Sequence, residues 1–248
     1  MDRLIYIAMT GAQQLLQQQA ASANNLANAA TTGYKAEMAA FRAAPVEGPG
    51  LPTRAYAVDT TIGADLTAGA IQPTGRDLDV AIEGDGFLTV QATDGNEAYT
   101  RSGSLALSPE GELRTRSGLA VLGDGGPIVV PQDSKVSIGR DGTVSIVTYG
   151  QSATNVTSVG KLKLVNPAGR DVIKGGDGLF RLRGGGSADA DNGVTVTAGA
   201  LETSNVNTVA AMVEMINLAR QFEMQMKLLQ NAESNAQRAT GLLSTSAG

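Results

Sequence analysis

The acidic residues are the side chains that come nearest to a catalytic pattern, because they occur in close pairs. Asp77 stands two positions before Asp79, and Glu83 stands two positions before Asp85. Two carboxylates held at a fixed separation in a cleft can hydrolyse a glycosidic bond. Such a cleft needs aromatic residues around it, and these make up only 4% of the chain. We therefore interpret the acids as surface and turn residues and keep a secreted, carboxylate-based hydrolase as a rival hypothesis.

The absence of histidine and cysteine restricts the catalysis and metal binding that the chain could support. The sequence contains no histidine and no cysteine, so the commonest general base, the commonest metal ligand and the thiolate nucleophile are all absent. A structural zinc site with cysteine ligands is excluded for the same reason. We expect no catalytic residue, no cofactor and no metal site, and we expect that the protein is not an enzyme.

Glycine-rich and acidic segments are the next candidates for ligand binding. Glycines cluster at 123–126, 175–178 and 184–186, but none of these clusters ends in the Lys–Ser/Thr pair of a phosphate-binding loop. The acidic segment 189–193 lacks the glutamate that closes a calcium-binding EF-hand loop. We interpret all four segments as turns and solvated loops.

Charge and hydropathy restrict the partners. The formal net charge is -5 and the sequence pI is about 4.8, which disfavours nucleic acid and anionic membranes. The sequence has no apolar run of the ~18 residues that a membrane-spanning helix needs. The short apolar stretch at the N-terminus runs into glutamines rather than a small-residue cleavage site. We expect no nucleic acid or small-molecule partner, no insertion into a membrane and no cleavable signal peptide.

Composition divides the chain into three zones. Residues 1 to about 30 contain no proline and a single glycine, Gly11, and residues 205–240 contain neither residue type. All eight prolines lie between positions 45 and 200. This distribution predicts a helix, a β-rich middle and a second helix. The expected fold class is α+β, mainly β, with long terminal helices that pair as a coiled coil around a central, irregular antiparallel β-domain. The expected parts are a helix at 1–32, an extended connection at 33–74, a β-domain at 75–200 and a helix at 201–248.

Both terminal segments carry apolar residues at intervals of three and four, which is typical of helices that bury one stripe. The C-terminal seam is predicted at Met212, Met215, Ala219, Phe222, Met226 and Leu229. The middle zone instead shows short alternating runs between turns. Examples are Val80 and Ile82 before a turn at 83–86, and Val136 and Ile138 before a turn at 140–142. Such runs predict antiparallel strands.

Several motifs resemble those of one known family. Residues 23–28 (Ala-Asn-Asn-Leu-Ala-Asn) and 31–35 (Thr-Thr-Gly-Tyr-Lys) are similar to the N-terminal signature of flagellar rod and hook proteins. Residues 78–87, 99–103 and 121–126 resemble the β-domain of that family, and residues 201–207 resemble the start of its C-terminal helix. The motifs follow the family's order over nearly the whole chain. The opening residues 1–6 and residues 220–227 are most similar to the proximal-rod members.

The resemblance implies an axial, structural protein of the flagellar basal body. It implies helical polymerisation that transmits torque along a periplasm-spanning rod, with the terminal helices in an inner coiled-coil tube. The implied partners are copies of the chain, other rod proteins that include the distal rod, and the flagellar type III export apparatus. A distal-rod or hook protein is the alternative within the family, and a β-rich adhesin or binding module on a coiled-coil stalk is an alternative from another class.

The residues expected at subunit interfaces lie on the terminal helices and in the adjoining signature motifs. They are Ile5, Ala12, Leu15, Asn24, Asn25, Leu26, Asn28, Gly33, Tyr34, Lys35, Asn205, Val206, Asn207, Met212, Met215, Ile216, Ala219, Phe222, Met226 and Leu229.

Overall fold

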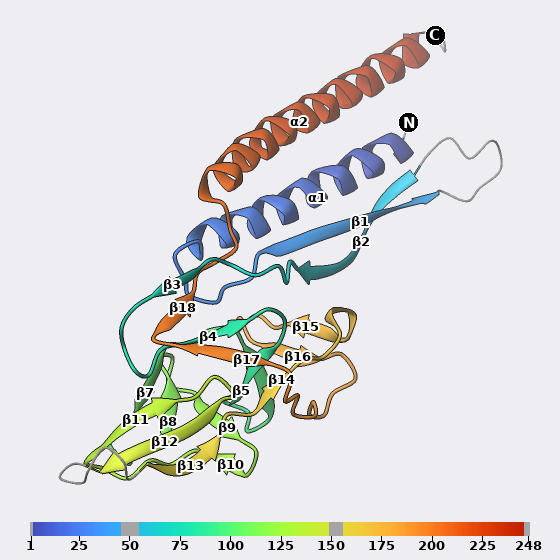
Figure 1. Cartoon of the computed structure of the whole chain (residues 1–248). Helices are drawn as coiled ribbons and strands as arrows, with labels where there is room; N and C mark the ends of the chain where they lie inside the picture. The colour runs from blue at the N-terminus through green and yellow to red at the C-terminus, as the bar shows by residue number, and fades with distance from the viewer. Residues whose placement is uncertain (1, 46–54, 149–155, 246–248) are drawn as a thin grey trace. The chain divides into compact units, whose positions relative to one another are not determined.

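The computed structural model describes residues 2–45, 55–148 and 156–245 (Figure 1). The chain divides into two compact units. The first unit comprises Met1–Ala27, Glu37–Gly63 and Asn207–Gly248, and the second comprises Asn28–Ala36 and Ala64–Val206. The described part of the chain contains no helix that is both long and apolar enough to cross a membrane.

Two long helices dominate the first unit. Helix α1 spans Asp2–Ala27 and helix α2 spans Thr208–Thr245. Asn207 caps α2, because its side-chain oxygen accepts a hydrogen bond from the backbone N–H of Ala210 (3.0 Å) and its carbonyl accepts one from Ala211 (2.9 Å). After α1, a turn begins at Asn28, whose carbonyl accepts a hydrogen bond from the N–H of Thr31 (3.0 Å).

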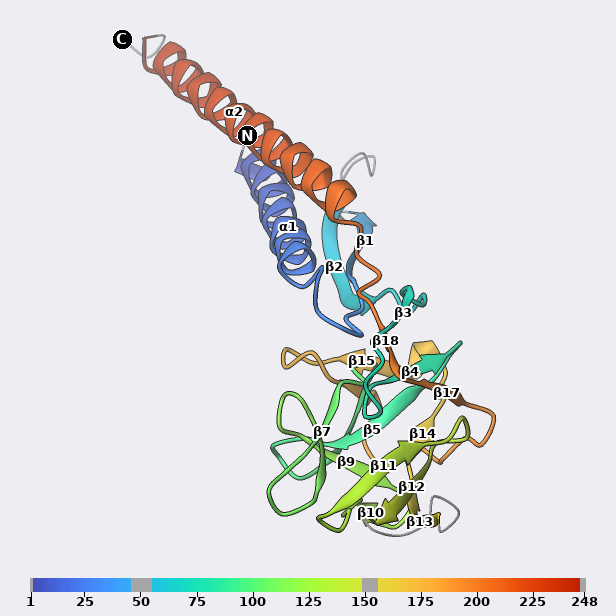
Figure 2. The same ribbon diagram turned by 60° about the vertical axis from the view of Figure 1, so that its left-hand side comes forward.

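The two helices lie side by side and run antiparallel (Figures 1 and 2). The Ser22 hydroxyl donates a hydrogen bond to the carbonyl of Ala211 (3.3 Å). Farther along, Gly11 faces Gln225, whose side-chain nitrogen would lie 3.1 Å from a Cβ atom added to the glycine. Residues near the end of α1 therefore meet the start of α2, as antiparallel pairing requires. The mainly β fold with two contacting terminal helices is confirmed.

A β-hairpin completes the first unit. Strands β1 (Glu37–Pro45) and β2 (Ala55–Ala64) form a two-stranded sheet, and β1 contacts α1. An isolated two-stranded hairpin is marginally stable in water, so contact with a helix contributes to its stability. Composition alone indicates only an extended connection here, because alanine is a poor strand former.

The second unit is built from short antiparallel strands. A nine-stranded sheet has the order β15-β16-β6-β5-β9-β8-β7, with β10 beside β9 and β14 beside β5. A three-stranded sheet (β11-β12-β13) and the pairs β17-β4 and β18-β3 complete it. The strands are β3 (Ile71–Pro73), β4 (Val80–Glu83), β5 (Phe87–Gln91), β6 (Glu97–Thr100), β7 (Leu105–Leu107), β8 (Leu113–Thr115), β9 (Ala120–Gly123), β10 (Gly126–Pro127), β11 (Ser134–Ile138), β12 (Thr143–Thr148), β13 (Thr157–Lys161), β14 (Leu164–Val165), β15 (Val172–Lys174), β16 (Phe180–Leu182), β17 (Thr195–Ala198) and β18 (Ala200–Glu202), with a 3-10 turn, η1, at Gly169–Asp171.

Two clusters of buried side chains hold these strands together. The larger one is aliphatic and includes Leu88, Val121 and Leu162. The smaller one is aromatic, with the rings of Phe87 and Phe180 5.0 Å apart. Burial of a large apolar side chain contributes about 1.5–3 kcal/mol, so these clusters account for the cohesion of strands that are only a few residues long.

The predicted strands are largely present, but their partners are less local than the turns indicate. The turn at 140–142 joins β11 and β12 as a hairpin, as expected. The turn at 83–86 does not make a hairpin: β4 pairs with β17, whereas β5 pairs with β6, β9 and β14. The apolar segment 128–130 does not form a full strand and contributes only a single bridge, between Val129 and Glu112.

Candidate functional site

The buried stripe of α2 follows a regular 4-3 spacing. Ala211 and Leu218 are buried, and the other members of the stripe are half-buried between exposed neighbours. The stripe consists of Ala211, Met215, Leu218, Phe222, Gln225, Leu229 and Ala232. Intervals of four and three keep side chains on one face of a helix. This face of α2 is therefore the one that contacts α1.

The seam predicted for α2 is partly displaced by one residue. Met215, Phe222 and Leu229 lie on the buried stripe, as expected. Met212 is 50% exposed and Met226 is 39% exposed, so neither belongs to the contact with α1. At those turns the stripe is occupied by Ala211, which is buried, and Gln225, which is half-buried. Neither was predicted, because alanine and glutamine are weaker hydrophobic signals than methionine.

The outward face of α2 carries a second apolar stripe near its start. Val209, Met212, Val213 and Ile216 follow a helical spacing, and each is at least half exposed. The outward face of α1 carries Met9 and Leu16, also about half exposed, and continues with exposed alanines. Contiguous exposed apolar surface rimmed by polar residues is typical of a protein-binding site. We call these two surfaces the outer stripes: Val209, Met212, Val213 and Ile216 on α2, and Met9, Leu16, Ala20, Ala23 and Ala27 on α1.

The remaining predicted interface residues on the helices are distributed as follows. Ala12 is buried, Leu15, Leu26 and Ala219 are half-buried, and Asn207 is exposed. The side chain of Ile5 lies outside the described residues.

The asparagines at the end of α1 bind the chain's own backbone and side chains. Asn25 donates to the carbonyl of Glu37 (3.0 Å) and accepts from its N–H (2.7 Å). Asn24 donates to both carboxylate oxygens of Glu37 (3.1 Å each). Asn28 accepts from the hydroxyl of Thr31 (3.2 Å). The bonds of Asn24 and Asn25 join the start of β1 to α1, and that of Asn28 holds the turn after α1. The asparagine-rich signature therefore has an intramolecular role.

A buried ion cluster lies in the second unit and contains Lys35. The Glu202 carboxylate accepts from the Lys35 ammonium (2.6 Å) through one oxygen and from the Arg101 guanidinium (3.1 Å) through the other. The side chains of Lys35 and Glu202 are each 1% exposed, and that of Arg101 is 2% exposed. We call these three residues the ionic latch. Burial lowers the pKa of Lys35, and the hydrogen bond to Glu202 opposes that shift.

The other signature residues surround the ionic latch. Gly33, with a φ of +67°, donates its N–H to the carbonyl of Glu202 (2.8 Å). The Tyr34 ring lies under the ammonium of Lys174 (3.7 Å to the ring centre), an attractive cation–π contact. The side-chain oxygen of Asn205 accepts from the N–H of Ala36 (2.8 Å). Val206, next to Asn205, is half-buried. Sequence reasoning identified these motifs but not their mutual contact, nor the part that Arg101 and Glu202 play in it.

The paired acids do not converge on a common site. Asp79 is buried and accepts hydrogen bonds from the hydroxyls of Thr74 (2.7 Å) and Ser104 (3.4 Å), whereas Asp77 is exposed and pairs with Lys135 (3.3 Å). Within the described residues, no group of three or more acids is placed to hold a metal ion. Their contacts are those of turn and strand residues.

Glu83 is held in its charged form by its neighbours. Hydrogen bonds from Thr197, Arg140 and Thr195 lower its pKa to about 2 from 4.5. Since the folded pKa lies below the unfolded one, the stabilisation is present above about pH 4.5 and is lost as the pH falls toward 2. We expect the variant Glu83→Gln to unfold at a lower temperature than the wild type at pH 7. Thermal unfolding followed at pH 7, 4 and 2 should show this difference shrinking; an equal difference at every pH would contradict it.

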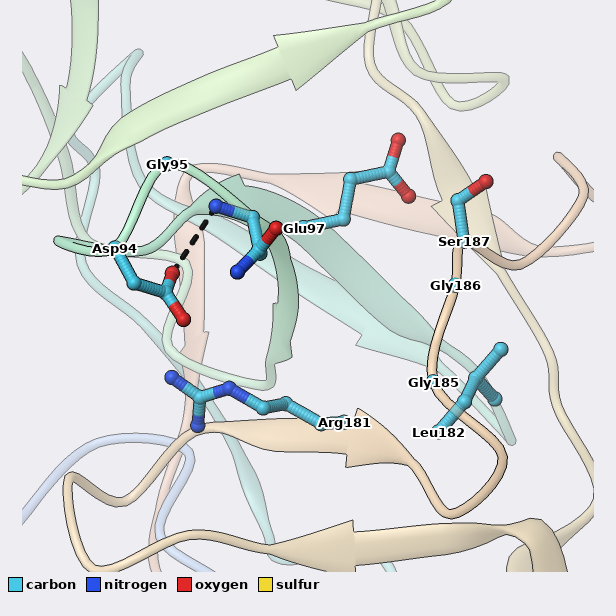
Figure 3. Close-up of a pocket in the computed structure, with 9 residues that line it drawn as sticks. Asp94, Gly95, Glu97, Arg181, Leu182, Gly185, Gly186 and Ser187 are labelled. Atoms are coloured by element: carbon cyan, nitrogen blue, oxygen red, sulfur yellow. Dashed lines mark hydrogen bonds between the residues drawn. The ribbon is translucent and has the colours of Figure 1, made fainter.

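An open pocket of about 470 Å³ lies on the second unit (Figure 3). Asp94 and Arg181 approach each other across it, and the backbone of Gly185 and Gly186 lines one side. Arg181 is paired with Asp177 (2.7 Å), and the N–H of Asn96 donates to Asp94 (3.0 Å). Charges that are paired with neighbours in this way are typical of a solvated surface.

Three family models match the chain. They are described as the flagella basal body rod protein (residues 5–35), the flagellar hook protein FlgE/F/G D1 domain (residues 81–146) and the flagellar basal body rod FlgEFG protein C-terminal (residues 197–242). The first and third fall on the two terminal helices and the adjoining signature motifs, and the second falls on the β-rich unit.

Full-length relatives agree with these matches. The flagellar basal-body rod protein FlgF of Escherichia coli is 49% identical over 99% of this chain and 100% of its own length. FlgF of Salmonella typhimurium is 47% identical over the same shares. FlgG of Bacillus subtilis is 32% identical over 98% of this chain and 99% of its own length. The chain therefore belongs to the family of flagellar basal-body rod proteins.

Proposed function

We propose that this protein is a structural subunit of the proximal rod of the bacterial flagellar basal body, where it polymerises axially and transmits torque. Similarity to FlgF proteins over the full length of the chain carries the proposal. The lower identity to FlgG supports the proximal position over the distal one. The work is mechanical, and no chemical step belongs to it.

The two faces of each helix suit this function. The inner faces pair α1 with α2 as an antiparallel coiled coil within one subunit, through the 4-3 stripe of α2 and the facing residues of α1. The outer stripes bind the terminal helices of neighbouring subunits. An open helical assembly uses heterologous contacts, in which two different surfaces of one subunit meet. The two outer stripes differ: that of α2 has only large side chains, whereas that of α1 combines Met9 and Leu16 with three alanines. They supply two such surfaces.

The partners follow from the same assignment. They are copies of this chain and other rod proteins as axial neighbours, together with the flagellar type III export apparatus. The inner, helical domain of the subunit contains α1, α2 and the β1–β2 hairpin. The β-domain contains residues 75–200 together with the adjoining segments of the second unit. The predicted interface residues Met212 and Ile216 belong to the contacts between subunits.

The outer stripe of α2 is tested by Ile216→Asp. Ile216 is 54% exposed, so the substitution leaves the folded subunit intact while it places a charge in the contact with a neighbour, where desolvation makes it costly. We expect circular dichroism and thermal unfolding to match the wild type, and motility in soft agar to be lost. The control is Asn231→Asp, which adds the same charge at an exposed polar site of the same helix. Wild-type motility of Ile216→Asp would contradict this use of the stripe.

Electron microscopy of basal bodies from a deletion strain tests the function itself. We expect the rod to be missing beyond its most proximal segment. A complete rod that lacks only the hook would place the protein in the hook instead, and a complete basal body would overturn the proposal. Complementation with the wild-type chain should restore the rod.

A further inference from the structure

Three passages of the chain meet at the carboxylate of Glu202. Its Oε1 atom accepts hydrogen bonds from the Lys35 ammonium (2.6 Å) and from the N–H of Gly69 (2.8 Å). The Lys35 ammonium also donates to the carbonyl of Thr67 (2.6 Å). One side chain therefore joins the segments 33–36, 65–70 and 200–205, which are far apart in sequence.

Asn205 repeats the connection between the same three segments. Its side-chain amide donates to the carbonyl of Asp65 (2.9 Å), while its oxygen accepts from the N–H of Ala36. The N–H of Asp65 donates to the carbonyl of Ala36 (2.8 Å). Close packing accompanies these bonds, because a Cβ atom added to Gly69 would overlap the carbonyl of Thr203.

The charges of the ionic latch make it sensitive to the loss of one partner. Two cations, Lys35 and Arg101, share the single carboxylate of Glu202, and all three side chains are nearly inaccessible to solvent. Arg101 is held further by the carbonyl of Gly84 (2.8 Å) and lies over the ring of Phe87. Removing the negative charge would leave two buried cations without the carboxylate that they share, which is strongly unfavourable.

The three joined segments lie next to points at which the chain passes from one compact unit to the other. The chain passes from one compact unit to the other after residues 27, 36, 63 and 206. Lys35 precedes the second of these points, Asp65 to Gly69 follow the third, and Glu202 to Asn205 precede the fourth. The ionic latch itself lies wholly within the second unit.

We propose that Glu202 is a positioning residue that keeps the segments 33–36, 65–70 and 200–205 at fixed distances from one another. Force carried by the backbone then enters the second unit through three segments that are rigidly joined. Without it, the segments 33–36, 65–70 and 200–205 could separate and stretch under load before the β-strands resist. The role in force transmission rests on the proposed function, whereas the rigid spacing is a property of the isolated protein.

Hydrogen exchange of the isolated protein, followed residue by residue, tests the rigid spacing. In Glu202→Gln the N–H groups of Gly33 and Gly69 are expected to exchange at least about tenfold faster, since a charge-assisted hydrogen-bond network is lost. The N–H of Leu113, which donates to the carbonyl of Ile128 in the core, should keep its wild-type rate. Glu83→Gln is the matched control: it makes the same chemical change at another hydrogen-bonded carboxylate and should leave Gly33 and Gly69 unchanged.

A second variant covers the case in which Glu202→Gln fails to fold. Glu202→Asp keeps the charge but is one methylene shorter, so it cannot hold Lys35 and Gly69 at their present distances, and the same N–H groups should exchange faster with the core unchanged. Unchanged exchange at Gly33 and Gly69 in a folded variant would overturn the proposal. Equal acceleration at Leu113 in Glu202→Asp would also overturn it, because Glu202 would then support the whole unit rather than the spacing of the passages.

The role of Glu202 in force transmission is tested separately, by the swimming speed of mutant strains. Swimming speed in media of increasing viscosity should fall more steeply for the Glu202→Asp strain than for the Glu83→Gln strain. Equal decline in the two strains would overturn the role in force transmission. A deletion strain with complete basal bodies would instead overturn the proposed function and leave the exchange result standing.

Discussion

Replacing Gly33 by alanine is expected to destabilise the second unit by about 3 kcal/mol or more. Gly33 has a φ of +67°, where a Cβ atom is unfavourable. The added Cβ would also lie 2.5 Å from the backbone nitrogen of Ser102 and closer still to the carbonyl group of Arg101. Neither clash is relieved by a side-chain rotation, because both involve backbone. Urea denaturation followed by near-ultraviolet circular dichroism measures the loss.

Gly84 provides the matched control for this substitution. Its φ of +71° is nearly the same, but a Cβ atom added there meets nothing within 4 Å. Gly84→Ala should therefore cost only the conformational term, about 1–2 kcal/mol. The difference between the two variants isolates the contact of Gly33 with the Arg101 backbone. Equal losses in both variants would show that this contact does not constrain the fold.

The sequence predicts those parts of the fold that depend on local composition. Prolines confined to residues 45–200 indicate where helices cannot continue, and both helices lie outside that range. Asp-Gly turns locate hairpins such as β11–β12. The pairing of β4 with β17 could not be inferred, because it joins residues more than a hundred positions apart and depends on which strands bury their apolar faces together.

The ionic latch could not be predicted from the sequence for a related reason. Lys35 and Glu202 are separated by 167 positions and Arg101 and Glu202 by 101, and nothing in the local sequence of any of them marks a partner. Charged residues are rarely buried, so the sequence predicts Lys35 at a subunit interface and gives no separate role to Arg101 or Glu202. The sequence holds two weak signals of these residues. Lys35 directly follows Gly33 and Tyr34, and Glu202 lies within the motif 201–207 that precedes α2.

The seam of α2 shows how far periodicity alone reaches. Several stripes with intervals of three and four can be drawn on a helix that has apolar residues on two faces. Large apolar residues favour a seam through Met212, yet Met212 and Ile216 are exposed, whereas the smaller Ala211 is buried on the stripe that faces α1. A helix that must contact both its own partner and a neighbouring subunit needs two such faces, so the ambiguity in the sequence follows from the proposed function.

Leu218→Asp is expected to separate α2 from α1. Leu218 is 6% exposed on the buried stripe, and its truncation alone would cost about 2–5 kcal/mol. The aspartate adds the cost of burying an unpaired charge. Isolated helices gain most of their stability from packing, so the N–H groups of α1 and α2 should lose protection from hydrogen exchange, and motility should be lost. The second unit should keep its protection, because its two core clusters are built from its own residues.

Two comparisons separate pairing within the subunit from binding between subunits. Asn217→Asp introduces the same charge one position earlier, on the exposed side of α2, and should leave helix protection unchanged. Ile216→Asp should also keep that protection but abolish motility, since it alters only the outer stripe. If Leu218→Asp kept its helix protection while Ile216→Asp lost it, the two faces would be assigned the wrong way round. The inner face must hold in the isolated subunit, whereas the outer face matters only once a neighbour is present.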